Sequence, residues 1–292
     1  MISRKFTIWA CGLLFVFGSC AEDMVKPIEN DKDAPGTVQD VKTESLPGAV
    51  KFTYTLPSDP DLLYVLAKYT NKTGKVMEFR SSFYTNSVTV EGFGDTDTYK
   101  VELYTVDRSE NRSQPQIVEV VPLTPPILSC YESLSMVSDF GGMTFEMDNK
   151  FKSDLAIYVC TPDELGDMVL AETFYSAREE IVYSVRGYDA VPRRFGIFLQ
   201  DKYGNETDTL FTELTPIYER ELDKTKFREM YLQNDSRVDS YDGKMEYVWN
   251  GRISKDGDSG GVGLHTGTGT KDGPAVFTFD LGVLAKLSRF AL

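Results

Sequence analysis

Between residues 36 and 216, apolar and polar residues alternate along a series of short stretches. Val50, Phe52, Tyr54 and Leu56 alternate with polar residues, and Pro57 ends the stretch. A period of two over this length predicts a β-strand with one buried face. Similar stretches occur at 38–41, 63–69, 76–80, 88–90, 99–107 and 117–121, and again at 143–147, 155–159, 169–175 and 181–185. Seven strands in residues 36–124 are typical of a β-sandwich. We therefore expect an all-β protein, with no helix longer than two turns between Gly36 and Pro216.

One strand and the turn after it occur twice. Residues 99–113 read YKVELYTVDRSENRS, and residues 193–207 read RRFGIFLQDKYGNET. Three turn residues recur 94 positions apart: Asp107 and Asp201, Asn111 and Asn205, Ser113 and Thr207. Asp can accept backbone N–H groups across a corner, and Asn tolerates the left-handed conformation. The motif predicts a structural hairpin, and calcium binding on the Asp is the alternative.

The repeat extends beyond the hairpin and indicates two modules. Ser82–Thr85 (SFYT) matches Thr173–Ser176 (TFYS), and the sequence LTP recurs at 123–125 and 214–216. A period this long corresponds to a whole domain. We assign the modules to 36–124 and 125–218. The proline-rich join at 121–126 favours an extended, stiff backbone.

The first module resembles a fibronectin type III domain. The sixth strand of that family typically reads Tyr-x-Val-x-Leu-x-x-x-Asp, which matches 99–107 and makes Tyr99 the tyrosine-corner residue. Phe52 takes the place of the usual core tryptophan. In the second module Arg193 stands where Tyr99 stands in the first, so the corner is lost there.

The N-terminus reads as a secretion signal. Arg4 and Lys5 precede an apolar run at 6–17, which is too short to span a bilayer. The small residues before Cys20 resemble a bacterial lipobox, which implies a signal peptide at 1–19, diacylated Cys20 and a tether at 20–35. Plain secretion with cleavage near Ala21 is the alternative. No later apolar run is long enough to cross a membrane.

Acidic residues directly after Cys20 resemble the surface-export signal of Bacteroidota lipoproteins, which implies an outer-membrane protein facing the cell exterior. The periplasmic face remains the alternative. The formal net charge of −14 argues against binding to nucleic acid or to anionic lipid, because both need a basic surface.

Cys130 and Cys160 are the two cysteines beyond the lipobox. An exported protein can form disulfides, so these residues either pair or serve as small buried hydrophobic residues on strands.

The C-terminal part differs from the two modules. Residues 219–230 form a charged connector, with room for one helical turn. The sequences FTFDLG at 277–282 and KLSRF at 286–290 resemble a discoidin-like domain, which is a jelly roll. That resemblance implies that 231–292 is about half of such a domain, truncated in a strand at Leu292.

Trp249 is the one tryptophan beyond the signal segment, and it is the candidate sugar-binding residue. With Asn250 it lies where the discoidin family often has ligand or calcium loops, although Asn250 replaces the Asp that calcium would favour. Burial of Trp249 in the core is the alternative.

The sequence predicts no enzyme. Gly257–Gly261 (GDSGG) matches the nucleophile motif of chymotrypsin-like proteases, but the sole histidine, His265, lies downstream of the serine. That chemistry needs an upstream histidine base in that fold. We expect no catalytic residues, no resident metal and no cofactor, calcium being the one alternative.

The arrangement as a whole resembles accessory lipoproteins of Bacteroidota polysaccharide-utilisation loci. This resemblance implies a glycan partner, an outer-membrane transporter complex nearby and spacer sandwiches. The alternative is a structural subunit without a sugar site that docks the transporter or an enzyme.

Overall fold

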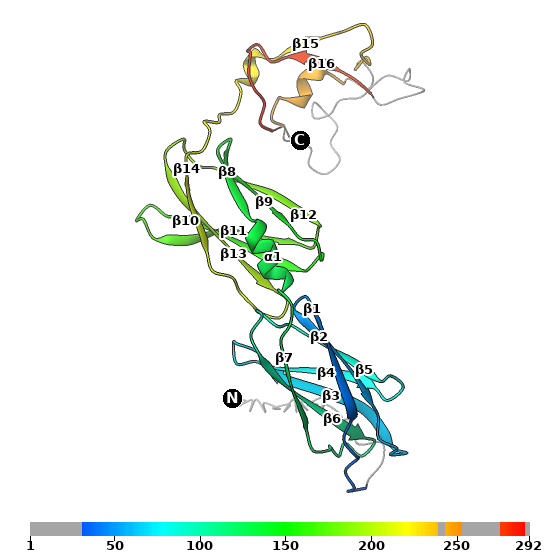
Figure 1. Cartoon of the computed structure of the whole chain (residues 1–292). Coiled ribbons are helices and arrows are strands. Elements are labelled where there is room, and N and C mark those ends of the chain that lie inside the picture. Colours follow the sequence, from blue (N-terminus) through cyan, green and yellow to red (C-terminus); the bar gives the residue numbers. More distant parts are fainter. Residues whose placement is uncertain (1–30, 239–242, 253–274, 290–292) are drawn as a thin grey trace, which may run out of the picture. The chain divides into compact units, whose positions relative to one another are not determined.

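The computed structural model describes residues 31–238, 243–252 and 275–289 (Figure 1). These residues fall into two compact units. The first consists of residues 31–91 and Asp97–Leu123, and the second of Gly92–Thr96 and Thr124 onward. Strands dominate both, which confirms the all-β prediction. Within the described residues no helix is long and apolar enough to cross a membrane.

The first unit is a sandwich of two antiparallel sheets. One sheet has the strand order β1-β2-β5 and the other β4-β3-β6-β7. The strands are β1 (Gln39–Leu46), β2 (Ala49–Thr55), β3 (Leu62–Thr70), β4 (Val76–Ser82), β5 (Ser87–Glu91), β6 (Tyr99–Asp107) and β7 (Gln116–Val120). Alternate residues of both sheets are fully buried, including Phe52, Val65 and Leu103. Phe52 thus lies in the core, as the sequence predicted.

The second unit contains a sandwich with the same strand order, in sheets β8-β9-β12 and β11-β10-β13-β14. The strands are β8 (Ser135–Asp139), β9 (Gly142–Asp148), β10 (Leu155–Pro162), β11 (Met168–Ser176), β12 (Glu180–Arg186), β13 (Arg193–Asp201) and β14 (Leu210–Leu214). Its core includes Phe145, Ile157 and Phe195. A shared strand order agrees with the internal sequence repeat.

Both repeated hairpins use the same hydrogen bonds. Asp107 Oδ1 accepts the N–H groups of Ser109 and Asn111 at 2.8 Å, and its Oδ2 accepts Asn111 Nδ2 at 2.9 Å. Asp201 Oδ1 accepts two N–H groups at 2.9 Å, and its Oδ2 accepts Asn205 Nδ2 at 2.8 Å. The carboxylates therefore hold the turns, which supports the structural interpretation of the motif.

The expected tyrosine position differs between the sandwiches. Tyr99 is buried at the start of β6, and its ring meets that of Tyr69 edge-on at 5.8 Å. Arg193 begins β13, where its Nη1 donates to Thr161 Oγ1 at 3.0 Å and its guanidinium lies 4.8 Å from the Tyr188 ring centroid. An aromatic contact in one sandwich is thus replaced by a cationic contact in the other.

The expectation that no helix longer than two turns precedes Pro216 is wrong. Helix α1 (Pro126–Ser133) has eight residues and lies between the proline-rich join and β8. Pro126 occupies its first turn, where the missing N–H costs nothing. Ile127 and Cys130, three residues apart, are buried against the second core.

The two cysteines do not pair, because both thiols are free. Cys130 lies on α1 and not on a strand as expected, with its Sγ 3.6 Å from Asn149 Oδ1. Burial, together with the nearby Asp148 charge, raises the pKa of Cys130 to about 11. Burial also raises the pKa of Cys160. Both are protonated, partly or fully buried side chains, which is the alternative that the sequence left open.

The described C-terminal residues contain short elements only. These are η1 (Lys224–Lys226), β15 (Arg228–Met230), η2 (Met245–Val248) and β16 (Thr278–Asp280). β15 and β16 pair antiparallel. The sequence predicts a strand within 285–292, but the described part of it, residues 285–289, contains none. A jelly roll is not shown by these elements, so the discoidin-like assignment of 231–292 stays a prediction.

Candidate functional site

The candidate site is built on the pairing of β15 with β16. Register places Glu229 opposite Phe279. Phe227 directly precedes β15, and Trp249 directly follows η2. The short 3₁₀ helix η1 is held at its start by Asp223, whose Oδ1 accepts Thr225 N at 3.1 Å. Segments far apart in the sequence thereby bring three aromatic side chains together.

Phe227, Trp249 and Phe279 form an aromatic cluster. The Trp249 ring lies 5.1 Å from the Phe279 ring and 5.7 Å from the Phe227 ring, centroid to centroid. Trp249 is half-buried. It is therefore a packing residue of this cluster and at the same time exposes part of its ring.

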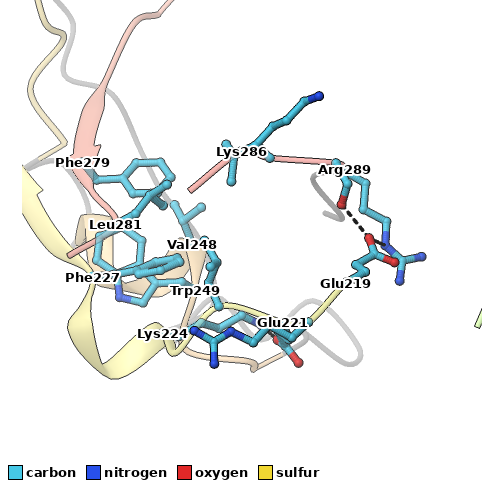
Figure 2. Close-up of a pocket in the computed structure, with 14 residues that line it drawn as sticks. Glu219, Glu221, Lys224, Phe227, Val248, Trp249, Phe279, Leu281, Lys286 and Arg289 are labelled. Carbon is cyan, nitrogen blue, oxygen red and sulfur yellow. Dashed lines mark hydrogen bonds and ion pairs between the residues drawn. The ribbon is translucent and has the colours of Figure 1, made fainter. Parts of the chain in front are cut away.

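The exposed side of the cluster lines a cavity of about 550 Å³. Figure 2 shows the aromatic side chains and Leu281 on one side and Glu219 with Arg289 on the other. The remaining lining includes Arg220, Glu221, Leu222, Lys224, Val248, Lys286, Leu287 and Ser288. An aromatic wall facing a polar one is the usual make-up of a small-ligand site, and the volume is within the usual range.

Asn250, the second predicted site residue, does not line this cavity. It lines an adjoining, more open hollow of about 440 Å³, together with Tyr247 and Gly251. Its Oδ1 accepts the N–H of Arg252 at 2.8 Å. Trp249 and Lys224 line both hollows, whereas Asn250 lines only the second.

Glu219 anchors the polar side of the larger cavity. Its side chain is 15% exposed and pairs with Arg186 Nη1 at 3.4 Å and with Arg289 Nε at 3.3 Å. Ser288 Oγ also donates to it, at 2.5 Å. Arg186 Nη2 in turn pairs with Asp139 Oδ2 at 2.8 Å. Residues 288–289 are thus tied to the edge of the β8-β9-β12 sheet.

The pKa of the Asp139 carboxyl lies below its usual value. Partial burial alone would raise it. The Phe140 N–H, the hydroxyls of Thr144 and Ser184 and the charge of Arg186 favour the ionised form and outweigh that effect. Asp139 is therefore ionised at neutral pH, and it pairs with the same Arg186 that pairs with Glu219.

Sequence reasoning identified Trp249 but missed Phe227, Phe279, Glu219 and Arg289 as parts of one site. The FTFDLG motif did contain Phe279. Cys20, Gly257–Gly261 and His265 lie outside the described residues.

Three carboxylates gather at the first hairpin, where the sequence left calcium binding as an alternative. Carboxylate oxygens of Asp31, Asp61 and Asp107 lie within 4.8 Å of one another. Both Asp107 oxygens already accept hydrogen bonds from the turn. Within the described ranges no such group includes Asp201. Among the described residues, the first hairpin thus has such a carboxylate group and the second does not.

Two family models match the chain. Residues 35–122 match a family described as "Domain of unknown function (DUF4959)", and residues 123–225 match "Domain of unknown function (DUF5126)". Neither spans half of the chain. No curated protein matches the sequence.

Solved structures show partial likenesses. A protein titled "SusE-like protein BT2857" is 27% identical with a TM-score of 0.33, and the match covers 56% of this chain and 57% of that one. A two-domain fibronectin type III segment of chicken tenascin is 12% identical with a TM-score of 0.30, over 62% of this chain and 99% of that one. The chain thus spans little more than half the length of the SusE-like protein.

Proposed function

We propose that this protein is a glycan-binding lipoprotein of a polysaccharide-uptake system at the bacterial outer membrane. The observation that carries the proposal is the cavity beside the aromatic cluster at Trp249. The apolar face of a pyranose ring can stack on an aromatic ring, while polar groups opposite fix its hydroxyls. The two sandwiches serve as spacers between this site and the lipid anchor at Cys20.

The test is affinity electrophoresis of the full-length protein against a panel of polysaccharides, with Trp249→Ala as the main variant. We expect Trp249→Ala to weaken binding about tenfold or more, because it removes the stacking surface. Tyr84→Ala is the matched control, since Tyr84 is 84% exposed in the first unit. Trp249→Phe preserves packing against Phe227 and Phe279 and should bind at an intermediate level. Binding that is equal in all four proteins would contradict the proposal.

The anchor has a separate test. Metabolic labelling with a palmitate analogue should mark the wild type and not Cys20→Ala, which should leave the membrane fraction. Labelling or membrane partition that survives in Cys20→Ala would contradict lipidation. Protease accessibility in intact cells distinguishes the outer surface from the periplasm.

Docking of a transporter or enzyme is the second candidate function, favoured by one exposed surface. At the β10–β11 turn Leu165 is 87% exposed beside Glu164 and Asp167, and Leu170 on β11 is 56% exposed. Exposed apolar residues gathered beside charge are typical of interaction surfaces. Co-purification with a transporter, combined with no binding to any glycan, would select this function.

A further inference from the structure

The cavity at Trp249 differs in charge from the chain that surrounds it. Its lining contains four basic residues, Arg220, Lys224, Lys286 and Arg289, and two acidic ones, Glu219 and Glu221. The whole chain carries a net charge of −14. A locally basic lining is therefore opposite in sign to the average surface of this protein.

Both carboxylates of the lining are already paired with cations. Glu219 pairs with Arg186 and Arg289, at 3.4 and 3.3 Å. Glu221 pairs with Lys224 at 2.6 Å. Their charge is therefore compensated within the site, and they do not offset the other cations of the lining.

Arg220 and Lys286 form no ion pair within the described residues. Both side chains are exposed. The Lys286 ammonium lies 5.4 Å from the Phe140 ring centroid, a contact that supplies no opposite charge. In Figure 2 Lys286 lies on the wall opposite Glu221 and Lys224. Among the described residues, Arg220 and Lys286 are thus the two lining cations without an ion-pair partner.

From this arrangement we infer that the cavity binds an anionic sugar, one that bears a carboxylate or a sulfate group. The inference rests on the proposed glycan-binding function and names its ligand class. The sugar ring stacks on the exposed part of Trp249, and Arg220 and Lys286 receive the anionic substituent. A guanidinium matches the planar oxygens of a carboxylate or sulfate, and its hydrogen bonds to an anion are stronger than those to a neutral hydroxyl.

The overall charge makes this preference testable by salt. An acidic protein repels a polyanion over distances of about 10 Å or more at low ionic strength, so attraction comes from the cavity alone. Added salt screens exposed charges and should weaken binding of the acidic sugar. Binding of a neutral sugar by stacking should change little.

The experiment compares polymers that share a backbone and differ in charge. Polygalacturonate is paired with its carboxyl-reduced derivative, and chondroitin sulfate with its desulfated derivative. The first pair tests a carboxylate and the second a sulfate. Full-length protein should bind at least one acidic polymer about tenfold more tightly than its less charged counterpart, and the preference should fall between 50 mM and 500 mM salt, roughly as expected for one or two charge contacts.

Two double variants locate the effect. Arg220→Gln with Lys286→Gln should abolish the preference, so that the acidic polymer binds no more tightly than its less charged counterpart. Lys42→Gln with Lys51→Gln, on β1 and β2 of the first sandwich, removes the same charge elsewhere and should keep the preference. Arg220→Lys keeps the positive charge and should retain most of the preference for the acidic polymer. Circular dichroism and thermal melting establish that each variant is folded.

The outcomes separate this inference from the proposed function. Trp249-dependent binding that is equal for charged and neutral polymers would overturn the inference and leave glycan binding intact. A preference that survives in Arg220→Gln/Lys286→Gln would also overturn it. Absence of Trp249-dependent binding to every polymer in the panel would overturn both.

Discussion

The two sandwiches make the same turn with opposite charges. The turns are Asn71–Lys75, between β3 and β4, and Asp163–Asp167, between β10 and β11. In each, the N–H of the first residue donates to the carbonyl of the fifth at 2.9 Å. The fourth residue is a glycine with positive φ, +81° at Gly74 and +89° at Gly166, which only glycine adopts without strain. The backbone of the two turns is therefore the same.

The outward-facing side chains of these turns have diverged. The first turn carries Lys72 and Lys75, and the second carries Glu164 and Asp167 at positions other than the first. What stays constant is the side-chain oxygen of the first residue, which accepts the N–H of the fifth at 2.9 Å in one turn and at 3.0 Å in the other. Side chains that bond to the backbone thus preserve the fold, and those that face solvent are free to change sign.

The strongest test of this comparison is at the tyrosine position. Tyr99→Ala should cost about 3 kcal/mol of unfolding free energy, because it leaves a cavity beside Tyr69. Arg193→Ala should cost less, about 2 kcal/mol, since it removes the hydrogen bonds to Thr161 and Pro162 and a half-buried contact with the Tyr188 ring. Urea denaturation followed by circular dichroism gives both values. Equal costs would mean that Arg193 carries as much stability as the tyrosine it replaces.

The repeated hairpin should show a smaller difference. Asp107→Ala should cost about 2 to 3 kcal/mol, because it leaves buried N–H groups without an acceptor. Asp201→Ala should cost less, since Asp201 is partly exposed whereas Asp107 is fully buried. Asp189→Ala, at an exposed loop position, is the control. A larger cost at Asp201 would show that the exposure of the aspartate does not determine how much this motif contributes to the free energy of unfolding.

A pH difference should separate the sandwiches further. Leu46 ends β1 where Asp139 ends β8 in the second sandwich. A carboxyl whose folded pKa is depressed stabilises the protein above its unfolded pKa, near 4, and loses that contribution as the pH falls through the folded value. Between pH 5 and pH 3 the second sandwich should therefore lose stability through Asp139, and the loss should fall mainly below about pH 4. Asp139→Asn should lose less over this range in urea titrations at both pH values, and an unchanged loss would contradict this role.

The smallest effect concerns the charges of the two turns. Exchanging them, by Lys75→Glu in one and Asp167→Lys in the other, should change stability by less than about 0.5 kcal/mol. Asp163→Ala should cost about 1 kcal/mol, because it removes the oxygen that accepts two turn N–H groups. The same denaturation series measures both. A charge exchange that costs more than Asp163→Ala would mean that the solvent-facing charges stabilise these turns more than the side-chain oxygen that accepts the backbone N–H groups.

Alternation along the chain was sufficient to predict most strands and the sandwich class. It could not predict α1, because Pro125 and Pro126 suit an extended join as well as the start of a helix. The helix buries Ile127 and Cys130 against the second core, and such a tertiary contact cannot be read from the local sequence. Short strands such as β8, with only partial burial, also lack a clear period of two.

The candidate site was predicted only as far as Trp249. The cluster joins residues 227, 249 and 279, and no local pattern links positions so far apart. Asn250 was assigned to the same site because it is adjacent in sequence. Adjacent side chains point in different directions, so Asn250 lines the neighbouring hollow instead.

The outer edge of β11 has a consequence for how this protein behaves when concentrated. β11 ends its sheet, contains no proline, and exposes Val169 and Leu170 among its first residues. β4 at the matching edge carries two charges, Glu78 and Arg80, whereas β11 carries one, Glu172. Charges protect an edge strand from pairing with another chain, and an apolar edge invites aggregation. Aggregates should therefore nucleate on the second sandwich, and Val169→Lys should raise solubility without disturbing the core.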